Sequence, residues 1–266
     1  MAETIAVLSL KGGTGKTTTV RTLADVLRRV GLSVLAIDLD PQGNLSDYFD
    51  VPRDAAPTVA DVLAGDAKAK EAVHDGVMPS SLNLAEVERA LSGKMGREVV
   101  LKKALKDLRK ALKDARKQHD VVLIDCPPAL GLLTINGLVA ADWALISSEA
   151  QYFALQGVQG ALDVIEQAKE FYNPDLEWLG VVMNIADMRT VHSREAYAQL
   201  KEALGDKVFD TVIRSSIAYA ESAERGLSIL DHRPDLGADY LALADEVLGR
   251  IGLRDARRAL KPLIVS

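Results

Sequence analysis

Short, mostly apolar runs alternate with longer amphipathic segments along most of the 266-residue chain. The apolar runs, which are typical of buried strands, begin near residues 5, 33, 121, 143, 176 and 208. Between them, apolar residues recur at helical spacing over residues 16–30, 98–117, 153–171, 191–204 and 235–251. This alternation predicts an α/β fold, in which helices cover both faces of a doubly wound, mostly parallel sheet. No repeat or low-complexity linker interrupts the pattern, so we expect a single domain over residues 1–266.

The periodicity is weaker between residues 51 and 96. There we expect short helices at residues 59–63 and 67–73, a short strand at 76–78 and a helix at 82–91. The helix at 98–117 has a basic outer face, which is compatible with nucleic-acid binding or with a soluble helix that covers the sheet. The single apolar stripe favours the covering role.

A glycine-rich segment, S-L-K-G-G-T-G-K-T-T, follows the first apolar run at residues 9–18. Its glycines allow a tight turn that directs successive backbone N–H groups into one cavity, where a polyanion can bind. The spacing places Lys16 near the outer phosphates of a nucleotide and the Thr17 hydroxyl on Mg²⁺. Leu10 replaces the first glycine of the usual motif, and Lys11 is an additional lysine. The predicted phosphate-binding residues are Lys11, Gly12, Gly13, Thr14, Gly15, Lys16, Thr17 and Thr18.

Two other apolar runs end in carboxylates. The segment D-L-D-P-Q-G-N brings Asp38 and Asp40 to the carboxyl edge of the sheet, where the glycine-rich loop also lies. The run at residues 121–124 ends in Asp125, which can hold a magnesium-bound water. We therefore predict a metal site formed by Thr17, Asp38 and Asp125.

Three motifs together resemble the ParA/MinD family of ATPases: K-G-G-T-G-K-T-T from Lys11, D-L-D-P-Q-G-N from Asp38, and D-C-P-P-A-L-G-L-L-T-I-N-G-L from Asp125. The similarity extends from residue 4 to about residue 250, and the P-Q-G-N continuation favours the ParA branch. It implies a P-loop NTPase fold, ATP and Mg²⁺ as cofactors, and a homodimer that sandwiches ATP. Only eight residues precede Ser9, as expected for the short type that lacks an N-terminal DNA-binding domain.

The resemblance also implies roles for particular residues. Lys11 would contact the nucleotide of the opposite subunit, Lys16 would neutralise phosphate charge, and Asp40 would orient the attacking water. Asp38 would lie near the magnesium shell, and residues 131–136 would form a switch that responds to the γ-phosphate.

The predicted base contacts are less closely matched to the family. Asn184 occupies a base-contacting position, whereas Arg214 and Ser216 stand where short ParA proteins carry proline and asparagine. We therefore expect backbone contacts at the last two positions. The resemblance alone predicts a preference for ATP over GTP.

The resemblance to the ParA branch implies DNA binding without sequence preference and a ParB-like partner that links the protein to a chromosome, a plasmid or a protein assembly. The net charge of −6 means that DNA contacts must come from a local basic patch. Arg189 matches one family arginine, whereas Ala218 stands at the second such position. The predicted replacement patch contains Arg189, Arg194, Arg214 and Arg225, although these side chains also suit an ordinary solvated surface.

Composition narrows the location and the chemistry. The chain has no run of 18 apolar residues and no secretory signal, so we expect a cytoplasmic protein that associates with the nucleoid in its ATP state. Its single cysteine, Cys126, excludes an internal disulfide and a metal site made only of cysteines. This excludes the two-cysteine cluster of nitrogenase-type reductases.

Three other functions remain open. A MinD-like membrane switch would use the basic, partly apolar segment at residues 250–266, although Pro262 should interrupt a helix there. A small-molecule kinase or ligase could use the same phosphate loop. A binding module without hydrolysis is disfavoured by the presence of Lys16, Thr17 and Asp40. We expect no stable membrane association.

Overall fold

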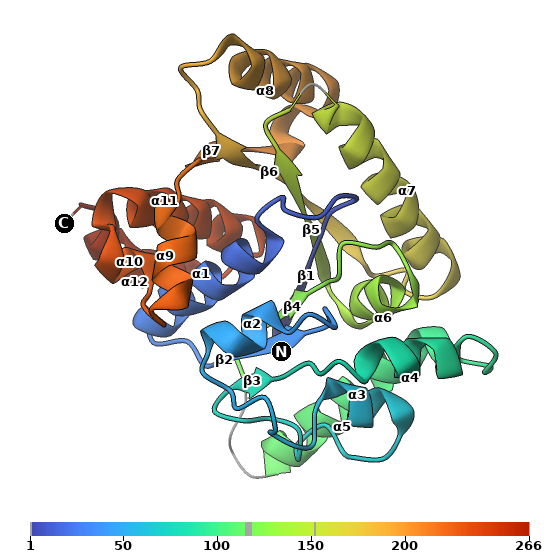
Figure 1. Cartoon of the computed structure of the whole chain (residues 1–266). Coiled ribbons are helices and arrows are strands. Elements are labelled where there is room, and N and C mark those ends of the chain that lie inside the picture. Colours follow the sequence, from blue (N-terminus) through green and yellow to red (C-terminus); the bar gives the residue numbers. More distant parts are fainter. Residues whose placement is uncertain (1, 115–118, 152, 266) are drawn as a thin grey trace.

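The computed structural model describes residues 2–114, 119–151 and 153–265 (Figure 1). Its strands are β1 (Glu3–Leu8), β2 (Val34–Asp38), β3 (Val77–Met78), β4 (Val121–Asp125), β5 (Trp143–Glu149), β6 (Glu177–Ala186) and β7 (Val208–Arg214). Within the described residues these seven strands form one sheet in the order β3-β2-β4-β1-β5-β6-β7, and every pair is parallel. The predicted α/β fold with a parallel sheet is confirmed.

Helices cover both faces of the sheet (Figure 1). One layer contains α3 (Val59–Ala64), α4 (Leu84–Leu91), α5 (Val100–Asp114), α6 (Leu132–Ala140), α7 (Ala154–Phe171) and α8 (Val191–Leu204). The other contains α1 (Lys16–Arg29), α2 (Asn44–Tyr48), α9 (Ala218–Glu224), α10 (Ile229–His232), α11 (Pro234–Arg250) and α12 (Arg254–Val265). Short 3₁₀ turns occur at Arg97–Val99 and Gly205–Lys207.

Alternation along β1 divides the core between the two layers. Ala6 and Leu8 pack into the core under α3–α8, whereas Ile5 and Val7 pack against the α1 layer. Strands β2 and β4 are buried along their whole length, which explains why the sequence shows them as continuous apolar runs.

The long predicted helices and the strands are confirmed within a few residues at each end. The helix expected at residues 67–73 is wrong, because that segment forms turns. Helices α2, α9 and α10, of five, seven and four residues, were not expected, because segments this short show helical periodicity only weakly. Helix α6 was also missed, and it occupies most of the predicted switch at residues 131–136. Residues 115–117 of the helix expected at 98–117 lie outside the described residues.

The C-terminal helix α12 uses its apolar side inside the fold. Leu260 is fully buried and Ala256 is nearly so, and Leu253, just before the helix, is partly buried against the same core. The predicted interruption at Pro262 is wrong, because the helix continues through it to Val265. None of the helices formed by the described residues has both the length and the apolar composition that a membrane span requires.

Candidate functional site

The carboxyl ends of three central strands meet at one edge of the sheet. In the parallel ladders, Asp125 of β4 lies beside Val7 of β1 and beside Asp38 of β2. The loop at residues 9–15 leaves β1 at this edge and leads directly into α1. Ligands of open parallel sheets bind at such an edge. A cavity of about 790 Å³ opens here, within the usual range for small-molecule sites.

The loop needs glycine at two positions for backbone reasons. Gly13 and Gly15 have φ angles of 78° and 81°, a region that disfavours residues with a Cβ atom. A Cβ atom on Gly15 would also lie 3.2 Å from Cγ of Asn184. The neighbouring Leu10 takes no part in this turn, and its side chain instead lies beside Gly160 of α7.

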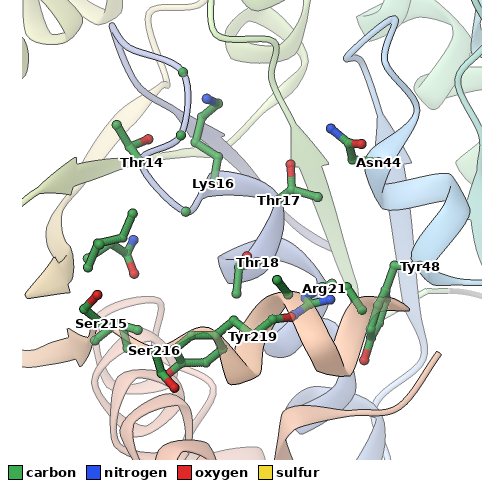
Figure 2. A pocket seen from close by; sticks show the side chains of 18 of the residues that line it. Thr14, Lys16, Thr17, Thr18, Arg21, Asn44, Tyr48, Ser215, Ser216 and Tyr219 are labelled. Atoms are coloured by element: carbon green, nitrogen blue, oxygen red, sulfur yellow. The ribbon is translucent and has the colours of Figure 1, made fainter. Parts of the chain in front are cut away.

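Lys16 lies at the start of α1 and lines the cavity, and only 6% of the residue is exposed (Figure 2). Its Nζ donates to Oγ of Ser9 over 3.1 Å, and Thr14 donates to the same oxygen over 2.9 Å. Burial lowers the pKa of Lys16 below its ordinary value. Ser9, to which the sequence assigned no role, therefore positions both the lysine and the loop.

Thr17 and Asp125, two of the three residues of the predicted metal site, are hydrogen-bonded to each other. The Thr17 hydroxyl donates to Oδ2 of Asp125 over 2.6 Å. The other carboxylate oxygen, Oδ1, is buried and has no hydrogen-bond partner in the described part of the chain. Burial and the nearby Asp38 carboxylate raise the pKa of Asp125 well above its usual range.

An unsatisfied carboxylate oxygen beside a hydroxyl is a suitable donor set for Mg²⁺, which prefers oxygen ligands. Across residues 2–114, 119–151 and 153–265, no group of three or more His, Cys, Asp or Glu side chains is arranged to hold a metal ion. The remaining ligands would have to be waters and phosphate oxygens, which is the usual arrangement for Mg²⁺ at nucleotide sites.

Asp38 and Asp40 occupy different environments. Asp38 is fully buried and accepts hydrogen bonds from the N–H of Asp40 and from the N–H and hydroxyl of Ser46. Burial raises the pKa of Asp38 to about 6. Asp40 is partly exposed and lines the cavity, and its Oδ1 accepts from the N–H of Gln42 over 3.0 Å. The structure thus brings Asp38 beside Asp125 and leaves Asp40 facing the cavity.

The Lys11 side chain contacts residues of its own chain. Its side chain is 64% exposed, and its Nζ lies 3.3 Å from Oε2 of Glu149 and 3.0 Å from Oε1 of Gln151. The sequence assigned no role to Glu149 or Gln151. Their position at the end of a predicted strand was the available signal, because that strand ends at the same edge as the glycine-rich loop.

The three residues predicted to contact the base all line the cavity, and each also has a structural contact. The Asn184 amide donates to hydroxyls of Ser147 and Thr19 beneath the loop. The Arg214 guanidinium binds Asp239 at 2.9 Å. Oγ of Ser216 accepts from a backbone N–H at the start of α9 over 3.2 Å.

Aromatic residues that the sequence did not indicate line the far end of the cavity (Figure 2). Arg21 is 3% exposed, and its guanidinium carbon lies 4.4 Å from the centre of the Tyr48 ring. The guanidinium also donates to the backbone carbonyl of Tyr219 over 2.6 Å. Arg21 therefore joins α1, α2 and α9 around this part of the cavity. Thr18, one of the predicted phosphate-binding residues, also lines the cavity.

The other predicted arginines lie on the surface. Arg189 is 91% exposed and pairs with Asp187 at 2.8 Å, and this pairing lowers the pKa of Asp187 to about 2. Arg194 donates to two backbone carbonyls in the loop that precedes α8. Arg225 is exposed at the end of α9, and the described residues provide no ion-pair partner for it. The positive charge of the predicted patch is thus partly compensated.

Comparison with known proteins identifies close relatives. Residues 2–178 match a family described as an AAA domain. The sporulation initiation inhibitor protein Soj of Bacillus subtilis is 36% identical over 93% of this chain and 98% of its own length. The chromosome partitioning protein ParA of Caulobacter vibrioides is 35% identical over 96% of this chain and 97% of its own length.

Solved structures share the fold. Cobyrinic acid a,c-diamide synthase of Mycobacterium smegmatis, solved with an ATP analogue and magnesium, is 36% identical with a TM-score of 0.73, covering 84% of this chain and 93% of the synthase. McdA of Cyanothece, solved with ATP, is 26% identical with a TM-score of 0.81, covering 94% of this chain and 96% of McdA. These relatives, together with the site geometry, show that the chain belongs to the ParA family of positioning ATPases.

Proposed function

We propose that this protein is a ParA-type switch that dimerises on binding Mg²⁺ and ATP, binds DNA without sequence preference, and is reset by hydrolysis. One observation carries the proposal: the phosphate loop, Thr17 and Asp40 line one cavity of nucleotide size, and the Thr17 hydroxyl is bonded to Asp125. Two similar structures hold ATP or an ATP analogue, which supports ATP as the ligand.

The chain's own groups divide the work of hydrolysis. Backbone N–H groups of residues 12–17 would bind phosphate oxygens, and Lys16 would neutralise charge at the outer phosphates. Thr17 and Asp125 would hold Mg²⁺, which neutralises charge on the phosphate oxygens when bound. Asp40 would orient the attacking water from its exposed place at the cavity wall.

Lys11 would act across the dimer. Its contacts with Glu149 and Gln151 are largely exposed, and exposed ion pairs contribute only about 0–1 kcal/mol. Such a weak contact would hold Lys11 near the loop and still release it to the phosphates of a second subunit.

The proposed matrix is the nucleoid, and the proposed partner is a ParB-like or other cargo adaptor. Arg189, Arg194 and Arg225 are the exposed candidates for phosphate contacts. Arg214 is the weakest candidate, because its guanidinium is held by Asp239 and by the backbone carbonyl of Asp235. A dimer would double any such patch, and binding would weaken steeply with salt.

Membrane association is disfavoured by the structure of α12. A helix that lies in a membrane surface inserts its apolar side, and here Leu260 and Ala256 on that side are buried within the protein. The location that we propose for the ATP state is the nucleoid, within the cytoplasm. Sedimentation with anionic liposomes and ATP would reveal the membrane alternative.

The deciding experiment measures ATP hydrolysis with Mg²⁺ alone, with double-stranded DNA, and with the adaptor and DNA together. We expect slow basal turnover that rises when adaptor and DNA are present, and faster turnover of ATP than of GTP. Because one similar structure is a small-molecule synthase, the same assay should include cobyrinic acid and an amide donor. Stimulation by those small molecules and indifference to DNA would replace the proposal with a biosynthetic function.

A further inference from the structure

A buried serine in α2 connects the ends of two strands beneath the candidate site. Ser46 is only 5% exposed, and both hydrogen-bonding capacities of its hydroxyl are used. The hydroxyl donates to Oδ2 of Asp38 over 2.7 Å and accepts from the N–H of Ser80 over 3.0 Å. Ser80 follows the edge strand β3, so this contact ties the end of β2 to the edge of the sheet.

Asp38 is hydrogen-bonded to both Ser46 and Asp40 and so links the two residues. Its Oδ2 receives two hydrogen bonds from Ser46, the hydroxyl bond and a backbone bond of 2.9 Å. Its Oδ1 accepts from the N–H of Asp40 over 3.1 Å. Two donors on one oxygen restrict rotation of the carboxylate about its last bond, and this keeps the other oxygen directed at the Asp40 N–H.

The position of the Asp40 main chain therefore depends on the orientation of the Asp38 carboxylate. A group that orients a water must be held to within a fraction of an ångström, because a displacement of about 1 Å can lower a rate by about 100-fold. Asp40 itself lies in a partly exposed turn, with its side chain bonded to the N–H of Gln42. The buried Ser46–Asp38 connection supplies a fixed support for that turn.

We infer that Ser46 is a positioning residue for hydrolysis, acting through Asp38 to hold Asp40 in place. The inference rests on the proposed role of Asp40. It assigns Ser46 no contact with nucleotide, since the residue lies behind Asp38 and does not line the cavity.

The test compares Ser46→Ala with Ser46→Thr, which keeps a hydroxyl, and with Ser81→Ala, which removes the hydroxyl of a serine in the loop after β3. The Ser81 hydroxyl lies 3.3 Å from the Thr58 hydroxyl, and in the described part of the chain it has no hydrogen bond to Ser46, Asp38 or Asp40. Three quantities are measured: single-turnover hydrolysis of ATP with Mg²⁺, the Kd for Mg²⁺ and ATP, and the melting temperature.

We expect Ser46→Ala to lower the hydrolysis rate by about 10-fold or more while changing the Kd less than about 2-fold. Ser46→Thr should recover most of the rate, and Ser81→Ala should match the parent. If Ser46→Ala does not fold, Ser46→Cys takes its place, because a thiol has similar size and donates weakly.

Asp40→Ala, measured in parallel, distinguishes failure of the Ser46 inference from failure of the role proposed for Asp40. If Ser46→Ala hydrolyses ATP at the parent rate and Asp40→Ala does not, the inference is overturned and the proposed function stands. An equal loss of rate in Ser46→Ala and Ser81→Ala would also overturn it, by showing general disturbance of the region. Normal hydrolysis by Asp40→Ala would instead refute the role proposed for Asp40.

Discussion

Lys16 illustrates how one residue is prepared for a polyanion. The fold buries its ammonium group beside the loop and gives it a neutral partner, the Ser9 hydroxyl, in place of a carboxylate ion pair. Burial lowers its pKa, which means that the charged form is less stable here than in water. A bound phosphate would supply the missing negative charge.

We therefore predict that Lys16→Ala weakens the binding of Mg²⁺ and ATP by about 10- to 100-fold, the range for a lost charged hydrogen bond. Equilibrium titration with a fluorescent ATP analogue measures the change. Lys103→Ala removes an exposed lysine of α5 and should bind like the parent. Unchanged affinity in Lys16→Ala would place the phosphates elsewhere.

Asp40→Ala should have the opposite profile, because a water-orienting carboxylate acts after binding. ATP affinity should stay within about 3-fold of the parent while hydrolysis falls by about 100-fold or more, so that the ATP dimer accumulates. Rapid-quench hydrolysis and size-exclusion chromatography with ATP give the two readouts. Asp54→Ala, at an exposed position in the loop after α2, is the control.

At the scale of elements, α12 shows how packing can use an amphipathic pattern that resembles a membrane anchor. Its basic side remains outside, where Arg257 pairs with Asp245 of α11 at 2.7 Å. Its apolar side joins the core on the α1 face of the sheet. The same residue pattern would suit a membrane surface or a protein core. The contact with α11 shows that here it serves the protein core.

Leu260→Ala should lower the free energy of unfolding by about 2–5 kcal/mol, because it leaves a cavity at a fully buried position. Ile264→Ala, on the same helix but 42% exposed, should change it by less than about 0.5 kcal/mol. Urea unfolding followed by circular dichroism measures both. Equal effects would mean that α12 is not docked as described.

The loop before α8 and the end of α9 carry the DNA prediction. Arg189→Glu and Arg225→Glu should each weaken ATP-dependent DNA binding and reduce its salt dependence by about one charge per lost phosphate contact. ATP-dependent dimerisation should be unchanged. Filter binding at two salt concentrations tests this, with Arg89→Glu on α4 as a control of the same charge change. If both variants bind like the parent, the DNA surface lies on α5 or α12.

At the scale of the whole molecule, Lys11 links assembly to chemistry in the proposed dimer. Lys11→Ala should reduce ATP-dependent dimerisation and hydrolysis together, because one ammonium group would serve both. Light scattering with a non-hydrolysable ATP analogue, combined with a hydrolysis assay, measures the pair. Lys106→Ala, an exposed lysine of α5, is the matched control. A normal dimer with normal turnover would confine Lys11 to its contacts with Glu149 and Gln151.

The sequence by itself determined the fold class and the phosphate loop, because both depend on local patterns. Buried parallel strands require continuous apolar runs, and the turn at residues 12–15 requires glycine where φ is positive. Strand ends locate Asp38 and Asp125, since parallel strands place their carboxyl ends at a common edge. The family motifs added the ATPase assignment that the relatives support.

Only the tertiary structure decided which groups surround those residues. The partners of Lys11 are 138 and 140 positions away, and Arg21 reaches Ser222 across 201. Such contacts depend on strand order and on short helices such as α2, whose five residues leave no periodic signal. The Ser46–Asp38–Asp40 connection depends on the position of α2 next to the end of β2, which the sequence pattern does not indicate. A hydrogen bond forms between groups that are close in space, and the positions of two residues along the chain do not show whether the fold brings them together.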